Sequence, residues 1–219
     1  MVEELLSLEE VAEEYPIILF DTCALLGRIK ESEEGIENRI WEEEEQINSA
    51  IFLREFIENS GGFYITPEIL REYSKGLNYS YKKKIKERGG KIQKRVLEIM
   101  RKSKVRAKER KKLVNSIEEF GKILRFEEDG EKMYGNLYNE YAETRRLKKI
   151  GYKDYGLLIS GLVTSIKRKP TCIISNDFAI LRAWGEILRR RWIDPSQFGF
   201  FTRNDFNGFQ KASLAKKYK

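Results

Sequence analysis

A short apolar run that ends in an aspartate places the strongest constraint on the fold of this chain. Residues 17–20 read Ile-Ile-Leu-Phe and are followed at once by Asp21. Four apolar residues are too few for a free-standing helix, and because they do not alternate with polar residues they predict a strand covered on both faces. In open α/β sheets, ligands and catalytic groups collect at the carboxyl ends of strands. An acidic side chain at that point is poorly placed for packing in the core and well placed to bind a ligand or take part in catalysis.

Composition excludes several classes of function. The chain has 219 residues, which is long enough to bury a sizeable core, and it contains no histidine, so histidine triads, general bases and metal ligands are excluded. Cys23 and Cys172 both lie in apolar stretches and predict reduced, buried thiols of a cytoplasmic protein. The acidic start of the chain and the lack of any run of about 18 apolar residues predict no secretory leader and no membrane partner.

The charge is segregated along the chain. Residues 1–60 contain 17 acidic and 4 basic residues, a net charge of −13, and the remaining residues carry +20, which together give the overall charge of +7. Residues 81–112 alone hold 16 lysines and arginines against three glutamates. Such a density favours a polyanion partner, nucleic acid above all, although a merely solvated face stays the alternative.

Strand-like and helix-like segments alternate. Apolar runs at 17–21, 63–66, 171–175, 191–193 and 198–201 predict strands, while helical periodicity covers 7–14, 36–59, the segment after Thr66-Pro67, and the segments after 152 and 177. Residues 78–124 are helical in propensity but poor in core positions, as in a projecting arm. The acidic face of 36–59 is either solvated or a docking surface for a basic partner or for the chain's own arm. The alternation predicts right-handed crossovers and a parallel sheet.

Four carboxylates are expected at one edge of this sheet. Asp21 and Asp177 follow strands, Glu72 borders the buried stripe of its helix, and Asp154 heads the buried stripe of another helix. Helix capping alone would also explain Asp154, and the helix dipole accounts for Glu68. Converging carboxylates raise one another's pKa, so the cluster is best explained as an oxygen-ligand site for Mg²⁺ or Mn²⁺. Two such ions about 4 Å apart activate a water and stabilise the leaving oxygen of a phosphodiester.

These stretches, in this order, resemble the PIN-domain nucleases. That family combines an apolar strand ending in Asp-Thr or Asp-Ser, a helical glutamate, an aspartate at a helix head, and a strand followed by Thr/Ser-Asn-Asp. The matching stretches are Ile-Ile-Leu-Phe-Asp21-Thr22, Thr-Pro-Glu-Ile-Leu-Arg-Glu72, Lys-Asp154-Tyr-Gly-Leu-Leu and Ile-Ser175-Asn176-Asp177. The resemblance covers about residues 15–77 and 150–200. A large helical insertion between the second and third carboxylates is also similar to the protein-only ribonuclease P relatives, but Gly156 stands where that group usually has a further aspartate.

The resemblance implies a three-layer α/β/α fold with a central parallel sheet of four to five strands. Residues 1–77 and 150–210 would form the discontinuous nuclease domain, and residues 78–149 an inserted basic helical arm. Asp21, Glu72, Asp154 and Asp177 would bind Mg²⁺ or Mn²⁺, with Thr22 and Asn176 as supporting or substrate contacts. The activity implied is hydrolysis of RNA to a 5′-phosphate and a 3′-hydroxyl. The expected RNA-binding residues of the arm are Arg101, Lys102, Lys104, Arg106, Lys108, Arg110, Lys111 and Lys112.

A processing endoribonuclease acting on structured RNA, such as tRNA or rRNA precursors, is the preferred hypothesis. The alternatives are the toxin of a toxin–antitoxin pair, which the length of the chain disfavours, a non-catalytic PIN module that binds RNA, and a plain protein-interaction domain. The sequence leaves open the number of metal ions, whether Glu68 replaces or assists Glu72, and whether the chain forms a homo-oligomer.

Overall fold

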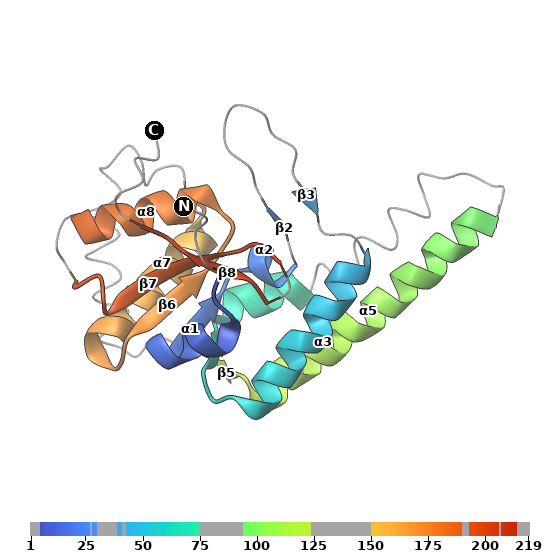
Figure 1. The fold of residues 1–219 in the computed structure, drawn as a ribbon, viewed down its shortest axis with the longest axis horizontal. Coiled ribbons are helices and arrows are strands. Elements are labelled where there is room, and N and C mark those ends of the chain that lie inside the picture. The colour runs from blue at the N-terminus through green and yellow to red at the C-terminus, as the bar shows by residue number, and fades with distance from the viewer. Residues whose placement is uncertain are drawn as a thin grey trace.

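The structure, a computed structural model, describes residues 5–26, 28–29, 39–40, 43–74, 94–123, 150–189, 193–205 and 207–213. It is a mixed α/β fold around a mostly parallel sheet (Figure 1). The strand order is β5-β4-β1-β6-β7-β8. The strands are β1 (Ile17–Phe20), β4 (Phe63–Ile65), β5 (Lys122–Ile123), β6 (Thr171–Ile174), β7 (Phe198–Arg203) and β8 (Phe209–Lys211). The first five in that order are parallel, and β8 runs antiparallel to β7. The predicted α/β class and central parallel sheet are confirmed.

Helices connect these strands. They are α1 (Leu8–Glu14), α2 (Thr22–Leu25), α3 (Glu43–Asn59), the helical residues 67–74, α5 (Lys94–Phe120), α7 (Tyr152–Lys167) and α8 (Phe178–Arg189). Local sequence signals define several of their ends. Ser7 and Glu10 form the predicted capping box at α1, and the Thr66 hydroxyl accepts the Ile69 N–H at 3.4 Å at the start of residues 67–74. No helix in the described part of the chain is both long and apolar enough to cross a membrane.

Several predicted elements differ from the structure. The helix expected at 36–59 begins at Glu43, because residues 39–40 form β3 (Arg39–Ile40), which pairs antiparallel with β2 (Arg28–Ile29). The helix of the arm ends at Phe120, and β5 then pairs with β4. The run at 198–201 forms β7 as predicted, and the strand β8 that pairs outside it was not predicted. Of the strand expected at 191–193, residues 191–192 lie outside the described residues, and Ile193 is a bend.

Side chains of β7 show that helices cover both faces of the sheet. On one face, the Trp184 ring of α8 lies 5.7 Å from the Phe200 ring, and Trp184 Nε1 donates to the Phe198 carbonyl at 2.9 Å. On the other face, the Tyr15 ring, directly after α1, lies 5.7 Å from the Phe201 ring. The inner strands β1 and β6 are consequently buried at every position. This explains why their sequences are continuous apolar runs without alternation.

The strand order creates a topological switch point between β1 and β6. From β1 the chain proceeds through β4 to β5 on one side, then returns to β6 and β7 on the other side of β1. In open α/β sheets, ligand crevices lie outside the carboxyl ends of the strands at such a point. The register pairs Phe20 with Ile174, and the Asp21 N–H donates to the Ile174 carbonyl at 3.0 Å. Asp21 and Ser175 therefore follow these two strands at the same level.

Residues 94–123 of the predicted arm are joined to the rest of the fold. Figure 1 shows α5 lying along α3, with the amino-terminal part of α5 reaching beyond it. At its other end α5 leads through Gly121 into β5, which extends the central sheet. Residues 75–93 and 124–149 of the predicted boundary regions lie outside the described residues.

Candidate active site at the switch point of the sheet

Asp21 is the buried centre of the candidate site. It is 5% exposed and caps α2, with Oδ1 accepting the Thr22 N–H at 2.6 Å. Its Oδ2 accepts hydrogen bonds from Cys23 Sγ at 2.6 Å and from Ser175 Oγ at 2.7 Å. Burial raises the pKa of Asp21, these hydrogen bonds oppose the change, and the nearby charge of Asp177 adds to it. The carboxylate is thus held in one orientation by donors from both sides of the switch point.

Asp177 joins the site through Ser175. Its backbone N–H donates to Ser175 Oγ at 3.0 Å, and the same hydroxyl donates to Asp21. Its Oδ1 accepts the Ala179 N–H at 2.8 Å, which caps α8. Asp177 is half-buried, and its charge contributes to the raised pKa of Asp21, so the two carboxylates are electrostatic neighbours.

Glu72 joins the site through Thr22. The Thr22 hydroxyl donates to Glu72 Oε2 at 3.1 Å, which connects residues 67–74 to the first turn of α2. The Glu72 side chain is 41% exposed, and its Oε1 lies 3.7 Å from Lys153 Nζ of α7. Three of the four predicted acidic residues, on three separate segments, therefore belong to one hydrogen-bonded network, hereafter the carboxylate network. Asp21 and Glu72 join it through their carboxylates and Asp177 through its backbone N–H, and the linking residues are Thr22, Cys23 and Ser175.

Asp154 comes from the start of α7, apart from the segments that carry the other three predicted carboxylates. It occupies the first turn of α7, is half-buried, and has its carboxylate near the Gly151 backbone. Because Lys153 contacts Glu72, the start of α7 is nevertheless at the same edge of the sheet. An acidic residue in a first helical turn is also stabilised by the helix dipole.

Asn176 supports the site from within the fold. Its Nδ2 donates to the Arg203 carbonyl at 3.0 Å, and its Oδ1 accepts the Arg203 N–H at 2.8 Å, so it joins the end of β6 to β7. It is 5% exposed. Both bonds hold the turn after β6, which carries Ser175 and Asp177, against β7.

Cys23 and Ser175 were not among the predicted site residues. Cys23 is buried, as expected for a reduced thiol, but it also donates to Asp21, and its sulfur accepts the Asn176 N–H at 3.2 Å. Burial and the charge of Asp21 raise the pKa of the Cys23 thiol well above its usual value, which keeps the proton that it donates. The spacing of Cys23, two residues after Asp21 in the helix that Asp21 caps, was the available signal.

The donor set fits a hard divalent cation. Within the described residues, no three Cys, Asp or Glu side chains are arranged as ligands of a single ion. Mg²⁺ does not require this, because it usually keeps several waters and is held by one or two carboxylates together with substrate phosphates. Three hydrogen-bond donors occupy three of the roughly four lone-pair positions of the Asp21 carboxylate, which leaves about one for a metal ion. The negative charge of Asp177 nearby would make a bound cation more stabilising. Asp21 and Asp177 could therefore hold Mg²⁺ or Mn²⁺ at this edge.

The basic residues of α5 divide into two groups. Lys108, Lys111 and Lys112 are exposed. Arg106 is 9% exposed and donates to Gln46 Oε1 at 3.4 Å. Arg110 is 6% exposed and donates to the Tyr73 carbonyl at 3.3 Å. Both contacts fix α5 against the fold. Arg106 and Arg110, which were expected to bind RNA, therefore face the fold, because residues four apart share one face of a helix. The side chains of Arg101, Lys102 and Lys104, also in α5, lie outside the described residues.

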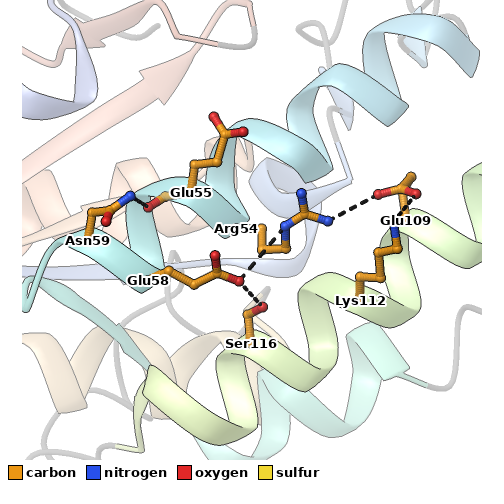
Figure 2. Close-up of polar contacts among 7 residues, drawn as sticks. All are labelled: Arg54, Glu55, Glu58, Asn59, Glu109, Lys112 and Ser116. Carbon is orange, nitrogen blue, oxygen red and sulfur yellow. Dashed lines mark hydrogen bonds and ion pairs between the residues drawn. The ribbon is translucent and has the colours of Figure 1, made fainter.

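Polar contacts between α3 and α5 complete the attachment of the arm (Figure 2). Arg54 Nη1 of α3 donates to Glu109 Oε2 of α5 at 3.3 Å, and Ser116 Oγ of α5 donates to Glu58 Oε1 of α3 at 2.8 Å. In the Arg54–Glu109 pair the cation comes from the acidic helix and the anion from the basic one. The packing of α3 against α5 nevertheless agrees with one alternative for residues 36–59, a docking surface for the chain's own arm.

Comparison of the chain with protein-family models, with curated proteins and with solved structures finds no match. The functional argument therefore rests on the geometry of the site.

Proposed function

We propose that this protein is a Mg²⁺- or Mn²⁺-dependent endoribonuclease with a PIN-like site that processes structured RNA such as tRNA or rRNA precursors. The observation that carries the proposal is the carboxylate network at the switch point of the sheet. Asp21, Glu72 and Asp177 come from segments far apart in the sequence, yet Thr22 connects Asp21 to Glu72, and the Ser175 hydroxyl connects Asp21 to the Asp177 backbone N–H. A central parallel sheet with helices on both faces is also the fold that the PIN resemblance implies.

Capping alone does not account for the network. Asp177 stabilises the start of α8, and an exposed aspartate would do this equally well. Asp21, in contrast, is 5% exposed, and burying a carboxylate is costly unless it is fully hydrogen-bonded or paired with a cation. Placing a second carboxylate beside it adds repulsion. Such a cost is typical of a functional site.

The chemistry assigns a role to each group. Mg²⁺ or Mn²⁺, when bound, would supply an activated water and charge stabilisation of the phosphodiester. Asp21 and Asp177 would hold the ion, Cys23, Thr22 and Ser175 would fix the direction of the Asp21 oxygens, and Glu72 and Asp154 would complete the acidic edge. The helices α7 and α8 begin at the same edge, and their amino ends favour a phosphate group electrostatically.

The arm provides the RNA contacts of the proposal. Because α5 leads into the start of β5, its amino-terminal part points toward the carboxyl edge of the sheet, the edge that carries the site. Figure 1 shows this part extending beyond α3. Exposed Lys108, Lys111 and Lys112 lie between the two ends of α5 and suit a phosphate backbone.

Replacing Asp177 by asparagine tests the activity. Asparagine also caps helices, so Asp177→Asn should retain the bond to Ala179 and the fold while removing a ligand charge. Asp194→Asn is the matched control: Asp194 is exposed, accepts the Ser196 N–H at 2.8 Å, and precedes β7 outside the site. Wild type, Asp177→Asn and Asp194→Asn would be incubated with tRNA precursors, rRNA fragments and unstructured RNA, in Mn²⁺ or in EDTA.

The proposal predicts cleavage by wild type and Asp194→Asn in Mn²⁺, none in EDTA, and a loss of at least a hundredfold in rate for Asp177→Asn, as is typical when electrostatic stabilisation of the transition state is removed. Equal cleavage by both variants, or cleavage in EDTA, would refute the metal site. Binding of RNA without cleavage by the wild type would instead favour a non-catalytic RNA-binding module.

A further inference from the structure

A groove lies at the opposite edge of the sheet from the carboxylate network. It has a volume of about 510 Å³ and is bordered by the segments that lead into β1, β4, β5 and β6. Since these strands are parallel, all of those segments lie at the amino edge. The catalytic proposal makes no use of this groove.

Its lining is basic. Lys122 comes from the start of β5, and Arg168 and Lys169 come from the connection between α7 and β6. All three are exposed, and none of the described residues that line the groove is acidic. The dipole of α7 favours positive charges at the carboxyl end of the helix, which explains why Arg168 and Lys169 are basic. It does not explain Lys122, which belongs to a different element.

Lys122 is held in place at the groove. Its Nζ donates to the Gly61 carbonyl at 2.9 Å and lies 5.3 Å from the centre of the Tyr64 ring. Gly61 and Gly62 have no side chains to fill the space beside it, so backbone forms this part of the wall. Fixing a lysine in this way lowers the entropy lost when it binds an anion.

We infer that this groove, with Lys122, Arg168 and Lys169 at its wall, binds the phosphodiester backbone of a single-stranded nucleic acid. Cations from separate elements facing one groove match a chain of phosphates, and the net charge of +7 favours a polyanion over other anionic partners. The inference rests on the proposed function only in that RNA is the expected source of this backbone. Contact here is sequence-independent, because phosphates carry no base information.

A matched pair of double variants tests it. Lys122→Gln/Lys169→Gln removes two charges from the groove, and Arg189→Gln/Lys211→Gln removes two elsewhere, from residues that pair with Glu186 and Glu14. Binding of 20-nucleotide RNA and DNA would be measured by fluorescence anisotropy in EDTA, so that metal-dependent cleavage cannot interfere. Circular dichroism would verify the fold, and Lys122→Arg/Lys169→Arg would test rescue by conserved charge.

The binding constant falls with salt concentration, and the slope of its logarithm against the logarithm of the salt concentration is about 0.7 for each phosphate contact with a single strand. The loss of two contacts should therefore reduce this slope by about 1.4 and weaken binding roughly 25-fold at 0.1 M salt. The control pair should lose far less, and the arginine variant should retain binding to both RNA and DNA. Equal losses in the two glutamine variants, or no loss in the groove variant, would overturn the inference. If the wild type cleaves RNA and the groove variant binds as tightly as the wild type, the proposed function stands and the groove inference is wrong. If binding depends on the groove but the wild type does not cleave RNA, the groove inference stands and the proposed function is wrong.

Discussion

Replacing Cys23 tests whether the thiol orients the Asp21 carboxylate. Cys23→Ala removes a donor to Asp21 Oδ2 and the acceptor of the Asn176 N–H. A hydrogen bond to a charged group contributes about 1.5–3 kcal/mol, with the weak S–H donor at the low end, and leaving a buried N–H without a partner costs about 1–3 kcal/mol. We expect Cys23→Ala to lower the free energy of unfolding by about 2–4 kcal/mol.

The order of alanine and serine variants distinguishes this role from simple packing. At Cys23, serine provides both a donor and an acceptor, so Cys23→Ser should be more stable than Cys23→Ala. At Cys172, a fully buried residue within β6, serine places a hydroxyl among apolar neighbours, so the order should reverse. Urea unfolding of the four variants, followed by circular dichroism, measures both orders.

A double-mutant cycle between Cys23→Ala and Ser175→Ala adds a second measurement. Both side chains donate to Asp21 Oδ2, and their Sγ and Oγ atoms are 3.4 Å apart, so their effects should couple by about 0.5–3 kcal/mol. The hypothesis is wrong if alanine and serine are equally tolerated at Cys23 and the two sites are additive.

Three further predictions concern stability. Gly199→Ala would place its Cβ 2.5 Å from the fully buried Tyr15 ring and should cost about 1–3 kcal/mol in urea unfolding, whereas Gly156→Ala, with nothing within 4 Å of the new Cβ, should stabilise α7 by about 0.5–1 kcal/mol. Arg110→Met removes the hydrogen bond to the Tyr73 carbonyl and the contact of the guanidinium with the Tyr73 ring, 4.8 Å from the ring centre. Thermal unfolding should therefore show a loss of about 1–3 kcal/mol for Arg110→Met and less than about 0.5 kcal/mol for the control Lys111→Met, because Lys111 is exposed. Equal effects of the two substitutions would contradict the packing role of Arg110. Burial raises the pKa of Cys172 well above the usual value of 9.0, so as the pH rises the thiol loses its proton in the unfolded chain before it does so in the folded protein. The free energy of unfolding should therefore fall as the pH rises above about 9. Cys172→Ala should show a smaller fall between about pH 8 and 10.5, and an unchanged fall would exclude Cys172 as its source.

Local patterns predicted much of the fold. The capping box at Ser7, the Thr66-Pro67 helix start and the buried runs that became β1 and β6 are all where the sequence indicates. These features depend on interactions within a few residues, or on the burial of both faces of a strand, and a sequence displays both directly. Asp21 and Asp177 follow from the same patterns, because Asp21 comes directly after the first apolar run and Asp177 lies in the short polar stretch after the later one.

Long-range pairing decided the rest. The register of β1 with β6 brings Cys23 and Ser175 onto the same carboxylate oxygen, although 152 residues separate them. Pairing with β2 makes Arg39 and Ile40 a strand in place of a helical turn, and the packing of α5 turns Arg106 and Arg110 inward while Lys108 and Lys111 face outward. The sequence by itself predicted Asp21, Glu72 and Asp177 as members of one site, but not Cys23 and Ser175. Only the tertiary structure decided which of them meet, because the contacts that join them form between segments whose separation no local pattern records.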